Sequence, residues 1–207
     1  MPSDDQLDPD RAFALLHVPR RARTAFAALW TLDAMLGRFV AQSREPMATQ
    51  IRLTWWHDAL SSLLLNSVQR DPLLQELVDH VLPSGIAGAE LAVLVEGWES
   101  VLGEPDADEA ALLDYAGKRG SQLFELTAQL MGVQHAAGCG EGWALIDLSR
   151  RMRGSATALR AAELGADRLT SCDAHRLPRA LRVLVRLARD DAAGRARTRW
   201  SYWRAVR

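Results

Sequence analysis

The sequence predicts an all-α protein, and three observations lead to this prediction. Apolar residues recur with the 3.6-residue period of a helix in almost every segment. No segment alternates apolar and polar residues as a half-buried strand does, and no Asn-Gly pair marks a hairpin. The 207 residues are 48% hydrophobic and 25% charged, which suits one globular domain with a sizeable core. We predict a single domain over 1–207, in which 195–207 form a basic aromatic tail.

Prolines mark the beginnings of the first helices. Asp8 and Pro9 combine a capping carboxylate with a proline at the first helical position. Pro19 interrupts this helix, because the residue before a proline avoids the α region. A long helix is predicted over 21–41, and Pro46 opens the next one. Residues four apart share one face of that helix, namely Met47, Ile51, Trp55 and Ala59.

Shorter helical segments follow. Apolar residues at helical spacing predict helices over 71–82 and 88–102. Asp106 or Asp108 caps a further helix, which Gly132 ends. The helical pattern therefore continues through the middle of the chain without an evident domain boundary.

The last third begins with a glycine-rich stretch, which predicts a loop over 138–142. A helix is then predicted over 143–164. Residues 171–173, Ser-Cys-Asp, cap another helix, and 166–172 form a candidate hinge.

Charge is unevenly distributed, although the formal net charge is only -1. Residues 1–149 carry 10 Lys+Arg against 21 Asp+Glu, a net of -11, and residues 150–207 carry 15 Arg against 5 Asp+Glu, a net of +10. The basic part could meet phosphates or an anionic membrane surface. The alternative, which we favour, is that these arginines solvate an outer face and pair with the acidic part.

The two cysteines and the N-terminal residues bear on localisation. Cys139 and Cys172 form no CxxC motif and suggest no disulfide framework, which favours a reducing compartment. The acidic N-terminal residues have no apolar core of the kind a signal peptide needs. No apolar run approaches the roughly 20 residues of a membrane span. We expect a cytoplasmic protein, at most peripheral to the inner membrane.

Four stretches resemble the squalene/phytoene synthase family, and together they span roughly residues 8–190. In chain order they are DRAFALLHVPRRARTAFAALWTLDAMLGRF, EPMATQIRLTWWHDAL, YAGKRGSQLFELTAQLMGV and LIDLSRRMRGSATALRAAEL, of which the second is the most specific. The resemblance implies an isoprenoid-synthase-like helical bundle around a central cavity. The chain is short for that family.

The resemblance also implies a loss of chemistry. Active members join two prenyl diphosphates, and two pairs of aspartates spaced i, i+4 hold the Mg²⁺ ions that bind each diphosphate. The first pair aligns with Gly37 and Ala41, and the second with Ala161 and Gly165. These side chains cannot bind magnesium. The chain is thus similar to a divergent branch of the family, which includes an assembly factor of respiratory complex I.

Several residues near the vacated positions are candidates for lining the cavity or binding a ligand, namely Asp33, Arg38, Arg52, Trp55, Tyr115 and Arg160. Asp33 lies on an apolar stripe and needs a cationic partner if buried, for which we predict Arg52 or Arg160. The arginines could bind a phosphate, or they could have surface or helix-pairing roles. Of the adjacent tryptophans 55 and 56, we expect one in the core and one half-exposed.

These observations favour a non-catalytic protein with no metal or other cofactor. It would bind an isoprenoid or another lipid, or support assembly of a membrane (respiratory) complex through a membrane-protein partner. One alternative is an active Mg²⁺-dependent prenyl transferase. Another is a binder of anionic surfaces or nucleic acid through the Arg-rich C-terminal part, although the sequence holds no known nucleic-acid motif. The oligomeric state is not predicted.

Overall fold

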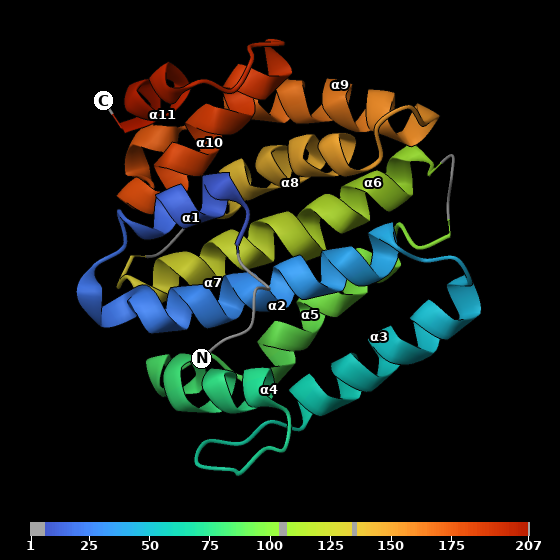
Figure 1. Ribbon diagram of the computed structural model, residues 1–207, viewed down its shortest axis with the longest axis vertical. Helices are drawn as coiled ribbons and strands as arrows, with labels where there is room; N and C mark the ends of the chain where they lie inside the picture. The colour runs from blue at the N-terminus through green and yellow to red at the C-terminus, as the bar shows by residue number, and fades with distance from the viewer. Residues whose placement is uncertain (1–6, 104–106, 134–135, 207) are drawn as a thin grey trace.

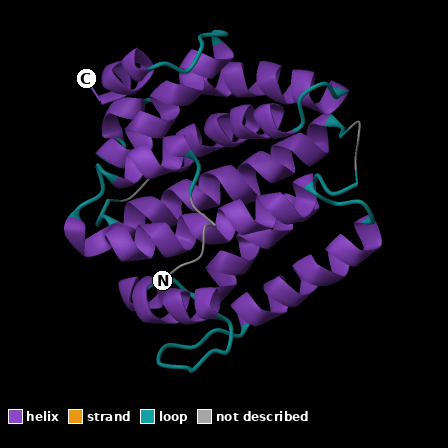
Figure 2. Ribbon diagram, in the orientation of Figure 1, coloured by secondary structure: helices purple, strands orange, loops and turns teal. Residues whose placement is uncertain are grey.

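The computed structural model describes residues 7–103, 107–133 and 136–206, and within these ranges it consists of helices and loops without strands (Figure 2). The all-α prediction is confirmed. The α-helices are α1 (Pro9–Leu15), α2 (Arg23–Ala41), α3 (Pro46–Ser61), α4 (Pro72–Glu76), α5 (Gly88–Glu99), α6 (Glu109–Tyr115), α7 (Gln122–Leu130), α8 (Ala137–Arg151), α9 (Ala156–Ser171), α10 (Arg179–Ala192) and α11 (Arg199–Val206). A π-helical segment, η4 (Ala116–Ser121), joins α6 to α7.

The helices form one bundle with α2 and α8 in its interior (Figure 1). The buried face of α2 includes Phe26, Trp30, Asp33 and Gly37, which follows the predicted stripe. Helix α8 packs between α9 and η4, and α3 packs on α5 at one edge. The first and last parts of the chain lie together, because α1 contacts α10 and α10 contacts α11.

The helix predicted over 143–164 is instead two helices. Helix α8 ends at Arg151 and α9 begins at Ala156. Gly154 between them adopts φ of +90°, a conformation that suits glycine and ends a helix. Ser155 then caps α9 by accepting a hydrogen bond from the Ala158 amide. The segment proposed as a hinge lies largely within α9, which runs unbroken to Ser171.

The glycine-rich stretch over 138–142 is helical rather than a loop. It forms part of the beginning of α8, where the backbone passes very close to η4. A Cβ atom on Gly140 would lie 2.1 Å from the carbonyl oxygen of Gly120, and one on Gly120 would lie 2.4 Å from that of Gly140. Glycine lowers helix propensity, but here only glycine permits the close packing of the two segments.

The outer face of α3 differs from an ordinary amphipathic helix. Leu53, Trp56 and Leu60 are buried against the bundle. On the opposite side Met47, Ile51 and Trp55 are exposed, by 73%, 66% and 53%. We call these three residues the α3 stripe. The expected split of the two tryptophans is thus confirmed.

The cysteine prediction was wrong. Cys139 and Cys172 form a disulfide that joins the beginning of α8 to the residue after α9. The bond closes a loop across 33 positions of sequence, a separation at which spacing alone gives no pairing signal. The two cysteines therefore no longer favour a reducing compartment, and the localisation stays a prediction.

Arginines of the basic C-terminal part mostly pair with acidic groups. Arg150 and Arg197 contact Asp10, Arg151 contacts Asp147, and Arg168 contacts Glu141. These pairs agree with the favoured interpretation of the charge asymmetry. Within the described ranges, no single helix is long and apolar enough to cross a membrane, although the bent pair 72–84 and 88–99 meets that test by length and composition alone.

Candidate functional site

A buried network of charges occupies the centre of the bundle. Asp33 on α2 is fully buried and accepts hydrogen bonds at both carboxylate oxygens. Arg119 donates from Nε to Oδ1 at 2.7 Å and from Nη2 to Oδ2 at 2.8 Å. Arg11 donates to Oδ2 at 3.0 Å, and the indole of Trp98 donates to Oδ1 at 3.0 Å. Asp33 is paired as predicted, but with residues other than Arg52 or Arg160.

Arg119 is the hub of this network. It lies in η4, is fully buried, and donates to Asp33, to Asp147 at 2.6 Å and to the phenol of Tyr115. Its guanidinium also stacks 4.2 Å from the ring centroid of Trp98, where a cation is attracted by the π face. Burial lowers the pKa of Arg119, but the charge of Asp33 outweighs it and raises the pKa above its ordinary value. Arg119 therefore stays protonated.

Asp147 on α8 links the network to the surface. Its Oδ2 accepts from Arg119 at 2.6 Å and from Arg151 Nε at 2.9 Å. Burial raises the pKa of Asp147, but the charges of Arg151 and Arg119 outweigh it and hold the pKa well below its ordinary value. Asp147 and Arg151 are one helical turn apart, a spacing that brings opposite charges together.

A groove of about 440 Å³ opens beside this network, between the C-terminal ends of α2 and α8. We call it the α2–α8 groove. Its lining residues are Gly37, Val40, Ala41, Ser43, Pro46, Trp98, Val101, Gly103, Leu148, Arg151, Met152, Arg153 and Ser155. Among the residues that the structure describes, the lining is mainly apolar, and its charged members are two arginines.

The first vacated position faces this groove. Gly37 and Ala41 both line it. A Cβ atom on Gly37 would lie 2.7 Å from the Trp98 ring and 3.3 Å from Nη1 of Arg151. Tryptophan and arginine thus fill the space next to Gly37, and an aspartate there would have no room.

The second vacated position lies elsewhere. Ala161 and Gly165 are on α9 and are buried. A Cβ atom on Gly165 would meet Ile146 and Leu145 of α8 at 3.0 Å, and neither residue of the pair lines the groove. Of the two vacated pairs, the first lines the α2–α8 groove. The side of the groove that faces Gly37 is formed by the end of α8 instead.

The remaining candidate residues fall into two groups. Tyr115 belongs to the buried network, and burial raises the pKa of its phenol. Arg52 is exposed and lies over the Phe39 ring at 4.9 Å, and Arg160 is paired on the surface with Glu109 and Glu163. Among the other candidates, Arg38 is half-buried and absent from the groove lining, and Trp55 belongs to the exposed α3 stripe.

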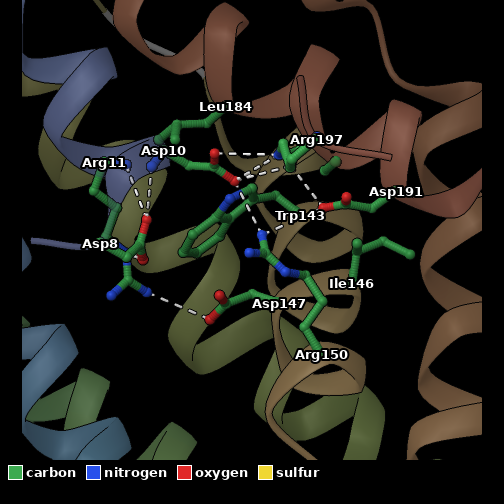
Figure 3. A pocket seen from close by; sticks show the side chains of 11 residues that line it. Asp8, Asp10, Arg11, Trp143, Ile146, Asp147, Arg150, Leu184, Asp191 and Arg197 are labelled. Carbon is green, nitrogen blue, oxygen red and sulfur yellow. Dashed lines mark hydrogen bonds and ion pairs between the residues drawn. The ribbon is translucent and has the colours of Figure 1, made fainter. Parts of the chain in front are cut away.

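A second charged site joins the two ends of the described chain (Figure 3). Asp10 on α1 accepts hydrogen bonds from Arg197 at 2.8 Å, from Arg150 at 3.0 Å and from the phenol of Tyr202 at 2.9 Å. Asp191 accepts from Arg197 at 2.7 Å. The space among these side chains is about 10 Å³, no more than one water needs. This terminal charge cluster is therefore structural.

The residues present do not fit the magnesium cluster that the resemblance implies. Magnesium requires carboxylate or water oxygens in octahedral geometry, and both oxygens of Asp33 are engaged by guanidinium and indole donors. The parts of the chain that the structure describes hold no group of three or more His, Cys, Asp or Glu side chains placed for a metal ion. The charged atom nearest the Cβ position of Gly37 is Nη1 of Arg151, which is cationic.

The fold and site together define a helical bundle with an interior polar network and an open groove. The family model for squalene/phytoene synthase matches residues 5–165, and the chain belongs to that family. Comparisons with curated proteins and with solved structures found no match.

Proposed function

We propose that this chain is a non-catalytic member of the squalene/phytoene synthase family that binds an isoprenoid or another lipid in the α2–α8 groove. The observation that carries the proposal is the composition of the groove, whose described lining is mainly apolar and contains two arginines but no carboxylate. Ionisation of a prenyl diphosphate needs divalent cations to neutralise the leaving group. The groove offers an acyl or prenyl chain an apolar lining, and its described residues offer magnesium no carboxylate.

A pair of assays tests this proposal. The protein is incubated with farnesyl or geranylgeranyl diphosphate and Mg²⁺, and diphosphate release is measured against a protein-free blank. We expect no release above the blank, and Mg²⁺-dependent turnover would refute the non-catalytic assignment and support the prenyl transferase alternative.

Lipid binding is tested separately with farnesol. Ala41→Trp places a large ring in the groove, whereas Ala48→Trp adds the same ring at an exposed position of α3 outside the lining. We expect farnesol to bind the wild type and Ala48→Trp, and to bind Ala41→Trp at least tenfold more weakly. Equal farnesol affinity of the two variants would show that the groove is not the lipid site.

A role in assembly of a membrane complex is a second candidate, favoured by the α3 stripe. Exposed apolar residues in a row are typical of a surface that another molecule covers. Ile51→Gln with Trp55→Gln removes two of the three side chains of the stripe, and neither of them is buried. If the stripe serves assembly, cells that produce this double variant lose respiratory activity, while the purified variant still binds farnesol. Unchanged respiration would dismiss the assembly role. For nucleic-acid binding we find no supporting contact, since the basic region largely pairs within the protein.

A further inference from the structure

We infer that the α2–α8 groove recognises a single-chain amphiphile with a phosphate headgroup, and that Arg151 and Arg153 bind this headgroup directly, without a divalent metal. The inference rests on the proposed lipid-binding function and assigns the headgroup. It begins from the misfit between the groove and a magnesium cluster. A groove whose charged side chains, among the described residues, are both arginines attracts the anion itself.

Arg151 is held in place to present its guanidinium to the groove. Its Nε donates to Asp147 at 2.9 Å, and its side chain is only 21% exposed. The guanidinium carbon lies 5.6 Å from the Trp98 ring centroid, and Nη1 lies 3.3 Å from the position of a Cβ on Gly37. Because Gly37 has no side chain, Nη1 of Arg151 lies beside this part of the groove lining. A planar fork of this kind suits two phosphate oxygens.

Arg153 supplies the second charge. It lies just after the end of α8, is exposed, and also lines the groove. Ser43 and Ser155 add hydroxyl groups to the same lining. Val40, Val101, Leu148 and Met152 provide the apolar part, on which a hydrocarbon chain can lie. The combination of a cationic end and an apolar wall matches an anionic amphiphile better than a free anion or a neutral lipid.

The probes are farnesyl phosphate, farnesol and inorganic phosphate, each titrated calorimetrically into the full chain in EDTA. We expect farnesyl phosphate to bind at least tenfold more tightly than farnesol, and inorganic phosphate to compete only weakly. Arg153→Gln should weaken farnesyl phosphate roughly tenfold, as expected for loss of a partly exposed charge-assisted hydrogen bond, and leave farnesol unchanged. Arg176→Gln, at a position outside the groove, is the matched control and should change neither affinity.

Arg151→Gln combined with Arg153→Gln should abolish the preference for the phosphate. Circular dichroism checks that each variant is folded, and Arg153→Gln keeps the inference testable if the double variant is not, because Arg153 is exposed. Equal binding of farnesol and farnesyl phosphate would overturn this inference and leave the lipid-binding proposal standing. A phosphate preference that appears only with Mg²⁺, or inorganic phosphate competing as well as farnesyl phosphate, would also overturn it. Binding of neither lipid would overturn both proposals.

Discussion

Removal of the Asp33 carboxylate is the most direct perturbation of the buried network. In Asp33→Ala, the guanidiniums of Arg119 and Arg11 lose their fully buried counter-ion. Breaking a buried ion pair by removing one partner costs about 3–5 kcal/mol. Asp147 still compensates part of the charge of Arg119, so we expect a cost near the lower end of this range. For a chain of this size each kcal/mol lowers Tm by about 2–4 °C, so we expect a Tm lower by about 6–20 °C.

The assay is thermal and urea unfolding followed by circular dichroism. Arg176→Ala is the surface control, because this arginine pairs with Asp173 while 85% exposed and its loss should change stability by less than about 1 kcal/mol. Asp33→Ala combined with Arg119→Ala completes a double-mutant cycle. The two substitutions should be less costly together than their sum, with a coupling of about 0.5–3 kcal/mol.

The pH dependence provides an independent check on the same reasoning. Burial raises the pKa of Asp33, but the charge and hydrogen bonds of Arg119 outweigh it and leave the pKa below its ordinary value. A carboxylate whose pKa is lowered by folding stabilises the protein above its unfolded pKa of about 3.9, and this stability is lost as the pH falls through the folded value. We expect wild-type stability to fall below about pH 4, and Asp33→Ala to show a smaller fall. If Asp33→Ala is as stable as Arg176→Ala, or loses stability on acidification as the wild type does, the network does not hold the bundle together as described.

Two other substitutions and one chemical change have clear expected outcomes. Gly37→Ala should lower the free energy of unfolding, because the overpacking cost of about 1–3 kcal/mol against Trp98 outweighs a helix-propensity gain of up to about 1 kcal/mol. Gly117→Ala is its matched control, since a Cβ there meets nothing within 4 Å, and urea unfolding should show no loss of stability. Equal effects at the two glycines would contradict the packing described. Reduction of the Cys139–Cys172 disulfide should cost about 2–4 kcal/mol for a loop of this length, measured as a lower urea midpoint with reductant than without it. An unchanged midpoint, with the thiols shown to be free, would mean that the bond does not constrain the unfolded chain.

Much of the helical pattern was predictable because burial follows the 3.6 period. Helices α2 and α3 begin or end within two residues of the predicted positions, helped by Pro46 and by the apolar stripe of α2. The break between α8 and α9 was missed, although Gly154 and Ser155 are a helix stop followed by a helix cap. The long apolar period on both sides outweighed this local signal. The glycines near 140 were missed for the opposite reason, since a tertiary contact overrides their poor helix propensity.

The site was only partly predictable. The sequence placed Gly37 and Ala41 at the groove and indicated that Asp33 needs a partner. It gave no sign that Arg119, 86 positions away in the chain, supplies that partner. The i, i+4 spacing of Asp147 and Arg151 was a local signal that could have been used. Whether Ala161 and Gly165 line the groove depends on which helix borders it. The packing of the helices decides this, and residue spacing does not.

The terminal charge cluster has a consequence for how the chain folds during synthesis on the ribosome. Asp10 leaves the ribosome 187 residues before its partner Arg197 and 192 residues before Tyr202. Until they emerge, helix α1 lacks part of the surface against which it packs, and the carboxylate of Asp10 is solvated. Helix α1 should therefore reach its final packing only after residues 197 and 202 have been synthesised, and a ribosome stalled before residue 190 should expose α1 to an added protease.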